Sequence, residues 1–195
     1  MKLVFATNNQ NKVNEIKSLL GEGIEIVSLK DIGCNEELPE TQETLEGNAL
    51  QKARYVADNY NVNCFADDTG LEIESLNGAP GVYSARYAGV ECKAEDNMTK
   101  VLAELDGKEN RLAKFRTIVA LILNGEEHSF EGKIDGSITR SKSGSDGFGY
   151  DPIFQPNGFD ITFSEMSMAE KNAISHRGKA VAKLVAFLKE ESPRF

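Results

Sequence analysis

The sequence predicts an α/β fold built on a mixed, twisted sheet with flanking helices. An apolar run at residues 2–6, a polar loop and a helical repeat give a strand–loop–helix start to the chain. Two long strand-like runs, 113–123 and 127–139, are joined through Asn124-Gly125, a dipeptide typical of tight hairpins. The first pattern favours parallel strands and the second adds antiparallel ones, so the sheet is expected to be mixed.

The remaining elements follow from the same kinds of pattern. Residues 13–20 repeat apolar side chains at helical spacing, and a buried strand is predicted at 62–66. Residues 24–29 are expected to form a further strand. Three more helices are expected, near residues 43–60, 93–105 and 176–190. The chain therefore alternates strands and helices in its first third and carries its long hairpin later.

Length, charge and cysteine content limit the class of protein. The 195 residues fit one domain or two lobes that share a core. We expect residues 1–195 to form a single domain of two lobes, with the long hairpin at about 113–139 in the second. A net charge of −9 argues against a nucleic-acid polymer as partner, because a phosphate backbone requires a broad basic face. No apolar run approaches the ~20 residues that span a bilayer, so no membrane partner is expected. Three cysteines without metal or disulfide spacing fit a reducing cytoplasm.

Two adjacent carboxylates, Asp67 and Asp68, follow the buried strand predicted at residues 62–66. Carboxylates in such a place destabilise the fold unless they are paired or bind a cation. The carboxyl ends of strands are also where open α/β sheets bind ligands. Because successive strand residues point to opposite faces, we expect Asp68 to face a site and Asp67 to orient a neighbouring lysine. The alternative is a turn capped by aspartate.

The loop Thr7-Asn8-Asn9-Gln10-Asn11-Lys12 lies between the first strand and the first helix. Backbone N–H groups at a helix N-terminus favour an anion, and the threonine, asparagine and lysine side chains add donors there. The loop lacks the glycines and the Gly-Lys-Ser/Thr ending of a Walker loop. It is therefore either a phosphate-binding loop of another kind or a polar capping loop.

Acidic residues gather ahead of the second predicted helix; they are Glu36, Glu37, Glu40, Glu43 and Glu46. Most of them are expected to be solvated or to complement the helix dipole. One of them could join Asp68 around Mg²⁺, an ion that prefers oxygen ligands and keeps several waters. On the helix itself, Asn48 and Lys52 are four residues apart and share a face, so Lys52 could reach a phosphate.

Two later segments could bind a flat or an anionic ligand. In Ser145-Asp146-Gly147-Phe148-Gly149-Tyr150-Asp151-Pro152, glycines beside aromatic residues allow a base to approach and stack, unless the segment is only a tight turn. Lys171 and Ser175-His176-Arg177-Gly178 place cations at the start of the last helix, where the dipole disfavours them. A nearby anion would explain this arrangement, and His176 or Arg177 could donate to a purine carbonyl or a phosphate.

Together these segments resemble the family of inosine/xanthosine triphosphate pyrophosphatases, also called noncanonical purine NTP pyrophosphatases. The motifs that carry the resemblance run in order along nearly the whole chain: Ala6-Thr7-Asn8-Asn9 with Lys12, Glu40-Thr41, Glu46 with Asn48-Ala49 and Lys52, Ala66 to Leu71, Gly78 to Tyr87, Gly147 to Phe154, and Lys171 with Ser175 to Gly178. Two departures are mild, since Asn8 stands where many relatives carry glycine and Thr69 where many carry serine.

The resemblance implies two lobes around a central cleft that holds the site, Mg²⁺ as cofactor, and a homodimer. By position, Asp68 matches the family's catalytic carboxylate, and Glu40 and Asp68 match its metal region. The residues that match nucleotide contacts are Thr7, Asn8, Asn9, Gln10, Asn11, Lys12, Thr69, Phe148, Gly149, Tyr150, Asp151, Lys171, His176 and Arg177.

The implied activity is hydrolysis of dITP/ITP and XTP/dXTP at the α-phosphorus to nucleoside monophosphate and pyrophosphate, which cleanses the nucleotide pool. In this hypothesis Lys12, Lys171 and Lys52 stabilise the leaving pyrophosphate. Asp68 holds the metal or accepts a proton from the attacking water. Two alternatives stay open: a related house-cleaning pyrophosphatase for other modified or pyrimidine nucleotides, and a nucleotide sensor that binds without cleaving.

Overall fold

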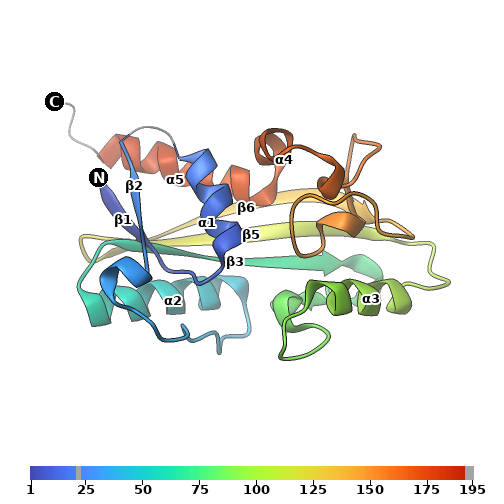
Figure 1. The fold of residues 1–195 in the computed structure, drawn as a ribbon, viewed down its shortest axis with the longest axis horizontal. Coiled ribbons are helices and arrows are strands. Elements are labelled where there is room, and N and C mark those ends of the chain that lie inside the picture. The colour runs from blue at the N-terminus through green and yellow to red at the C-terminus, as the bar shows by residue number, and fades with distance from the viewer. Residues whose placement is uncertain (21–22, 192–195) are drawn as a thin grey trace. The chain divides into compact units, whose positions relative to one another are not determined.

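The computed structural model describes residues 1–20 and 23–191 (Figure 1) and confirms an α/β fold with a mixed sheet. Among these residues, seven strands form one sheet in the order β2-β1-β3-β5-β6-β7, with β4 paired to β3. The strands are Lys2–Phe5 (β1), Glu25–Ser28 (β2), Cys64–Ile73 (β3), Pro80–Gly81 (β4), Leu112–Leu123 (β5), Glu126–Ile138 (β6) and Phe154–Pro156 (β7). The α-helices are Gln10–Leu19 (α1), Leu45–Tyr60 (α2), Ala94–Glu104 (α3), Met168–Ile174 (α4) and His176–Glu191 (α5).

Residue contacts divide the chain into two compact units. Unit 1 comprises Met1–Asp68, Thr117–Gly132 and Arg177–Phe195, and unit 2 comprises Thr69–Arg116 and Lys133–His176. The chain passes from one unit to the other within β3, β5 and β6 and at the start of α5. The expectation of a cleft that holds the site stays a prediction.

In unit 1, β1 pairs in parallel with both β2 and β3, as the strand–loop–helix start of the chain predicts. Helices α1 and α5 cover one face of these strands, and α2 covers the other face (Figure 1). The face under α1 and α5 is packed by alternate apolar residues of the strands; the cluster contains Leu3, Phe5, Val13, Ile16, Phe65, Val119, Leu121, Leu123, Ala180, Val181, Leu184 and Leu188. The rings of Phe5 and Phe65 stack there with centroids 4.6 Å apart.

Strands β5 and β6 form the predicted hairpin, and their bounds differ from the predicted ones by no more than one residue. Asn124 and Gly125 have φ values of 51° and 84°, and a two-residue type I′ turn requires positive φ at both positions. The side-chain oxygen of Asn63 accepts the N–H of Asn124 at 2.8 Å, which ties the turn to the residue before β3.

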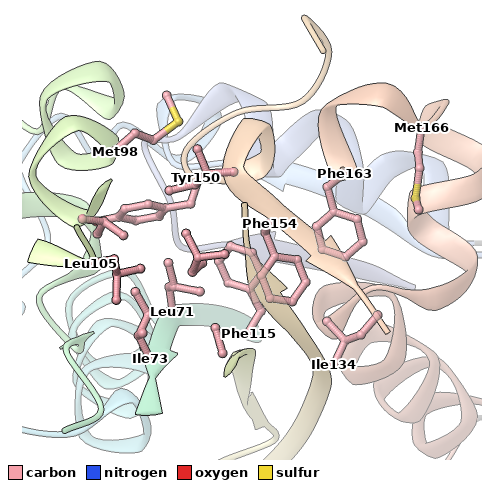
Figure 2. Close-up of a cluster of buried hydrophobic side chains, with 14 residues drawn as sticks. Leu71, Ile73, Met98, Leu105, Phe115, Ile134, Tyr150, Phe154, Phe163 and Met166 are labelled. Carbon is pink, nitrogen blue, oxygen red and sulfur yellow. The ribbon is translucent and has the colours of Figure 1, made fainter. Parts of the chain in front are cut away.

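Unit 2 has a hydrophobic cluster of its own (Figure 2). Its members come from β3, from α3 and the residue after it, from β5 and β6, and from the chain after β6; they are Leu71, Ile73, Met98, Val101, Leu105, Ala113, Phe115, Ile134, Ile138, Tyr150, Ile153, Phe154, Phe163 and Met166. Ring centroids are 4.6 Å apart for Phe115 and Phe154 and 5.2 Å apart for Phe154 and Phe163. These three rings therefore pack against one another within the cluster.

The prediction that β3 ends before the two aspartates is wrong. The strand continues to Ile73, so Asp67 and Asp68 lie within it. It continues because its partners change along its length: β1 pairs with it at Cys64 and Phe65, and antiparallel β4 pairs with it from Leu71. The aspartates therefore lie beyond the carboxyl end of the parallel neighbour rather than at the end of their own strand.

Other features of the chain agree with the sequence or add to it. The three cysteines are free thiols. Within the described residues, no helix combines the length and the apolar character needed to cross a bilayer. Helix α4 was not predicted, although Ser167 and Glu170 form a capping box at its start.

Candidate active site

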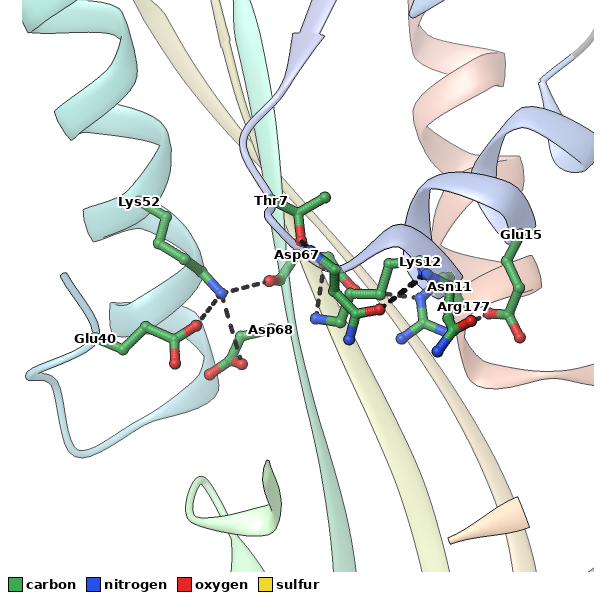
Figure 3. A network of polar contacts seen from close by, with 10 residues as sticks. Thr7, Asn11, Lys12, Glu15, Glu40, Lys52, Asp67, Asp68 and Arg177 are labelled. Atoms are coloured by element: carbon green, nitrogen blue, oxygen red, sulfur yellow. Dashed lines mark hydrogen bonds and ion pairs between the residues drawn. The ribbon is translucent and has the colours of Figure 1, made fainter. Parts of the chain in front are cut away.

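An ion-pair network in unit 1 joins the two aspartates of β3 to three cations (Figure 3). Asp67 binds the Nζ atom of Lys12 at 2.9 Å through Oδ1 and the Nε atom of Arg177 at 3.2 Å through Oδ2. Oδ1 of Asp68 lies 3.8 Å from the Nζ atom of Lys52. The three cations belong to α1, α5 and α2, so three helices converge on one short stretch of β3.

Asp67 is fully enclosed and holds two cations in place. Burial alone would raise the pKa of its carboxyl, but the charges of Lys12 and Arg177 outweigh burial and hold the pKa below its usual range. Burial lowers the pKa of Lys12, against the opposing charge of Asp67. Asp67 is therefore an ionised carboxylate that orients a lysine, as the alternation of side chains along the strand predicts.

Asp68 meets a different electrostatic environment. The residue is 8% exposed, and its burial raises the pKa of the carboxyl above its usual value against the attraction of Lys52 and Lys12. The nearby charge of Glu40 acts in the same direction as burial. A carboxylate with a raised pKa is a stronger proton acceptor, so Asp68 suits the role of a general base better than Asp67 does.

Lys52 is buried and forms a junction between several acidic groups. It forms an ion pair with Glu40 and donates to the backbone carbonyl of Asp67 at 2.8 Å. Burial alone would lower the pKa of Lys52, but the charges of Asp68 and Glu40 outweigh it and raise the pKa. The carboxylates of Glu40 and Asp68 thus meet at one ammonium group, which fits their predicted assignment to a common site.

Glu40 and Asp68 are also the side chains predicted to hold a metal ion. Within residues 1–20 and 23–191, no three His, Cys, Asp or Glu side chains are grouped so that they could bind a metal. Mg²⁺ is usually held by one or two carboxylates and completes its shell with water and substrate phosphates. Two carboxylates are hard oxygen donors, so the chemistry of this pair fits Mg²⁺ or Mn²⁺.

The loop from Thr7 to Lys12 begins where β1 ends, beside β3. The hydroxyl of Thr7 accepts the N–H of Asn9 at 3.1 Å. The side chain of Asn9 caps α1 by accepting the N–H groups of Asn11 and Lys12 at 3.0 and 3.2 Å. The exposed residues of this loop are Asn8, Asn9, Gln10 and Asn11. The loop is therefore a helix cap that leads Lys12 into the ion-pair network, and its contact with a phosphate stays a prediction.

Glu15 is a member of the network that sequence reasoning missed. The guanidinium of Arg177, which is 2% exposed, binds Glu15 of α1 as well as Asp67. The anion expected near the basic start of the last helix is thus a pair of the protein's own carboxylates. Glu15 follows Lys12 by three residues on the same helix face, and this spacing was the available signal. Contact between Arg177 and a nucleotide stays a prediction.

A second group of predicted contacts lies in unit 2. Lys171 is buried, with its Nζ atom 2.6 Å from Oδ2 of Asp151 and 4.9 Å from the ring centroid of Phe148. Asp151 also accepts the N–H of Phe148 at 2.9 Å. A Cβ atom at Gly147 would lie 2.2 Å from the Asp151 carboxylate, so only glycine fits there. The turn is therefore built around Asp151.

Tyr150 and His176 are packed inside unit 2. The hydroxyl of Tyr150 donates to the carbonyl of Ser84 at 2.6 Å. The ring of His176 stacks on Phe115 with centroids 4.5 Å apart. The other two predicted contacts in this unit are Thr69, half-buried in β3, and Gly149, in the turn before Tyr150. Roles for these residues toward a nucleotide stay predictions.

Comparison with known proteins gives one consistent result. A family model described as the Ham1 family matches residues 3–187. The chain is 57% identical over 189 residues to the dITP/XTP pyrophosphatase of Flavobacterium psychrophilum, and the aligned region covers 97% of this chain and 100% of that protein. It is 54% identical over 188 residues to the dITP/XTP pyrophosphatase of Porphyromonas gingivalis, and the aligned region covers 96% of this chain and 97% of that protein.

Solved structures show the same similarity. The Ham1 protein of Staphylococcus aureus superposes with a TM-score of 0.89 at 37% identity, over 98% of this chain and all of that chain. A dITP/XTP pyrophosphatase from Mycobacterium abscessus superposes with a TM-score of 0.77 at 44% identity, over 95% of this chain and 99% of that chain. The likeness therefore covers the residues of both units.

Proposed function

Because this chain belongs to the Ham1 family, we propose that it hydrolyses the noncanonical purine nucleotides dITP/ITP and XTP/dXTP to nucleoside monophosphate and pyrophosphate. Relatives with 54–57% identity over nearly the whole chain are named dITP/XTP pyrophosphatases, which supports this substrate class. The observation that carries the proposal is the network of unit 1, in which two buried aspartates meet cations from three helices. Such an enzyme cleanses the nucleotide pool of deaminated purines.

Asp68 is the proposed general base. It takes a proton from water while the water oxygen bonds to the α-phosphorus and the bond from that phosphorus to the bridging oxygen breaks. The products are the nucleoside monophosphate and pyrophosphate. The raised pKa of Asp68 supports the choice of this residue over Asp67, whose pKa is lowered by the two cations that it binds.

Lys12 and Lys52 are proposed to stabilise negative charge on the departing pyrophosphate, and Lys171 has the same proposed role. Cations already fixed by carboxylates need little rearrangement as the charge develops, which is the basis of electrostatic preorganisation. The N-terminus of α1, together with residues Thr7 to Asn11, is proposed to add backbone and side-chain donors to the phosphates.

Mg²⁺ is the proposed cofactor, and a pyrophosphatase family is consistent with a divalent metal. Glu40 and Asp68 would hold the ion, because their carboxylates meet at Lys52 and are oxygen ligands of the preferred kind. When bound, the ion supplies charge neutralisation and polarisation of a phosphoryl oxygen.

Base recognition is proposed for residues 148–151 and His176, with Thr69. Stacking of a base on Phe148 would contribute roughly 1–3 kcal/mol whichever base is present. A donor from His176 would favour the carbonyl at position 6 of hypoxanthine and xanthine over the amino group of adenine. Arg177 already binds Glu15 and Asp67, so we propose that it acts on the site through Asp67.

The enzyme is further proposed to act as a homodimer in the cytoplasm on free nucleotides. A net charge of −9 supports free nucleotides over a nucleic-acid polymer. Light scattering after size exclusion should give twice the chain mass of 21.4 kDa if the dimer forms. A single chain mass at micromolar concentration would contradict this part of the proposal.

A substrate panel tests the proposed function. Pyrophosphate release should be faster with dITP and XTP than with dATP, dGTP, dTTP or dUTP at equal concentrations. Faster turnover of dTTP or dUTP than of dITP would instead favour a house-cleaning enzyme for pyrimidine nucleotides. Tight binding of dITP without turnover in the presence of Mg²⁺ would favour a nucleotide sensor.

The variant Asp68→Asn tests the site. We expect it to lose pyrophosphatase activity by at least about 100-fold, because a positioned base contributes roughly 10²–10⁴-fold to rate. The matched control is Asp58→Asn on α2, which removes the same charge from an exposed position and should leave the activity unchanged. Activity retained by Asp68→Asn would overturn the assignment of the base.

A further inference from the structure

Glu40 lies outside every helix and strand of the described chain, in the segment that precedes α2. Its carboxylate forms the ion pair with Lys52, and 34% of its side chain is exposed. A carboxylate on an irregular and partly exposed segment loses conformational entropy when it is held in one place. Other contacts must therefore restrain the segment, and they come from α2.

Two side chains of α2 bind the backbone immediately after Glu40. Gln51 accepts the N–H of Thr41 at 2.9 Å and donates to the hydroxyl of Thr41 at 2.8 Å. Asn48 accepts the N–H of Gln42 at 2.9 Å. The two peptide groups that follow Glu40 are thus tied to the helix.

The face of α2 that restrains this segment also carries Lys52. Asn48, Gln51 and Lys52 are spaced by three and four residues, so they lie on one side of the helix. Gly47 permits the close approach of the segment, since a Cβ atom there would lie 2.7 Å from Cβ of Gln42. One helix face therefore holds both the segment and the ammonium group that binds its carboxylate.

We propose that Gln51 and Asn48 are positioning residues for Glu40. They act through the two peptide groups that they bind, and they thereby keep the carboxylate of Glu40 beside that of Asp68. The inference rests on the proposed function, in which Glu40 and Asp68 hold the divalent ion. The inference assigns to Gln51 and Asn48 the role of setting the separation between the two metal-binding carboxylates.

The variant Gln51→Ala tests the proposal because it removes both bonds to Thr41 without altering any charge. Mn²⁺ binding, followed by electron paramagnetic resonance without nucleotide, should weaken about 10-fold, as for other residues that orient metal ligands. The Mg²⁺ concentration that gives half-maximal pyrophosphate release should rise by a similar factor, while kcat at saturating Mg²⁺ changes little.

Controls separate this role from a general loss of structure. Asn59→Ala on the same helix removes one bond, from Asn59 to the carbonyl of Tyr55, and should leave Mn²⁺ binding unchanged. Gln51→Glu keeps an oxygen acceptor for Thr41 and should retain the affinity that Gln51→Ala loses. Should Gln51→Ala fail to fold, Gly47→Ala replaces it, because the added methyl group displaces Gln42 and should also weaken Mn²⁺ binding.

A double-mutant cycle with Glu40→Gln decides whether Gln51 acts through Glu40. In the Glu40→Gln background, Gln51→Ala should cause no further loss of Mn²⁺ affinity. Additive losses, or unchanged Mn²⁺ binding in Gln51→Ala, would overturn the inference while Asp68→Asn still abolishes hydrolysis. Full activity in Asp68→Asn would overturn the assignment of the base, and faster turnover of dTTP or dUTP than of dITP would overturn the proposed function, whatever the result for Gln51.

Discussion

At the scale of single residues, Asp67 and Asp68 carry the same carboxyl group but meet different neighbours. Asp67 is bonded to Lys12 and Arg177, whereas Asp68 is 3.8 Å from Lys52 and close to the negative charge of Glu40. Alternation along β3 places the two side chains on opposite faces. Two adjacent positions therefore supply a structural anchor and a proposed base.

This difference predicts different effects of two matched substitutions on stability. Asp67→Asn leaves the half-buried Lys12 without its counter-charge and Arg177 with Glu15 as its remaining partner, and should reduce the free energy of unfolding by about 3–5 kcal/mol. Asp68→Asn removes a carboxylate whose folded-state pKa is raised, so its ionised form is destabilising at neutral pH and its loss should not reduce stability. Urea denaturation at pH 7 measures both, and an equal loss of stability in the two variants would contradict this assignment of roles.

Sequence reasoning identified most of the charged residues of unit 1 but not their partners. The pairing of Asp67 with a lysine follows from side-chain alternation and was predicted. Glu15 was missed because a glutamate in a helix is usually solvated, and only the packing of α1 beside α5 brings it to Arg177. The spacing of Lys12 and Glu15 places both on one face of α1, but the sequence gives no signal that pairs Glu15 with Arg177, so a tertiary structure was needed to find that pair.

At the scale of elements, two capping boxes order the chain before α5. Glu165 accepts the N–H of Thr162 at the start of a short 3₁₀ helix, Phe163–Glu165, and Glu170 accepts the N–H of Ser167 at the start of α4, each at 2.8 Å. Hydrogen bonds from these backbone N–H groups hold the pKa of both glutamates below its usual value.

The lowered pKa values predict acid sensitivity of these caps. A carboxyl with a folded-state pKa below its unfolded value stabilises the protein above the unfolded pKa, and this stability is lost as the pH falls through the folded pKa. When the pH falls from about 5 to about 3, the free energy of unfolding should therefore decrease less in the double variant Glu165→Gln/Glu170→Gln than in the unchanged protein. Thermal denaturation across this range tests the prediction.

Two exposed glutamates outside the capping boxes provide the control for this measurement. The double variant Glu37→Gln/Glu43→Gln removes the same number of carboxyl groups and should keep the acid sensitivity of the unchanged protein. Equal pH profiles for the capping-box variant and the unchanged protein would count against the caps as a source of acid lability.

The sequence predicted the type of most long elements, because periodicity reports which face is buried. It failed for the end of β3, since the continuation of a strand depends on which partner lies beside it. The pairing of β1 with β3 joins residues that are distant in the sequence, so no local pattern reports it. Helix α4 has seven residues, too few for apolar periodicity to be recognised, and only its capping box indicates it.

At the scale of the whole molecule, each unit has its own hydrophobic cluster, but neither unit is a continuous stretch of chain. The chain passes between them four times, within β3, β5 and β6 and at the start of α5. Unfolding of either unit would therefore remove part of the hydrogen-bonded length of three strands.

This connectivity predicts a single cooperative unfolding transition. Calorimetry should give a ratio of calorimetric to van't Hoff enthalpy near ~1. Phe163→Ala in unit 2 and Phe5→Ala in unit 1 each empty a fully buried site and should cost about 3–5 kcal/mol. Each should lower the temperature of the one transition. Two separate unfolding transitions in the unchanged protein, or a single transition that divides into two in one of the variants, would show that the units unfold independently.

The charge of the ion-pair network of unit 1 also bears on whether a phosphate ligand binds with or without a metal ion. The formal charge of the network is 3 − 4 = −1, because it has three basic side chains and four acidic ones. The basic residues are Lys12, Lys52 and Arg177, and the acidic ones are Glu15, Glu40, Asp67 and Asp68. While no metal ion is bound to the protein, a metal-free polyphosphate would add to this negative charge, whereas a polyphosphate that carries a metal ion has part of its charge already compensated. The protein should thus bind a nucleotide that carries a metal ion more tightly than the metal-free nucleotide, whichever purine base the nucleotide has.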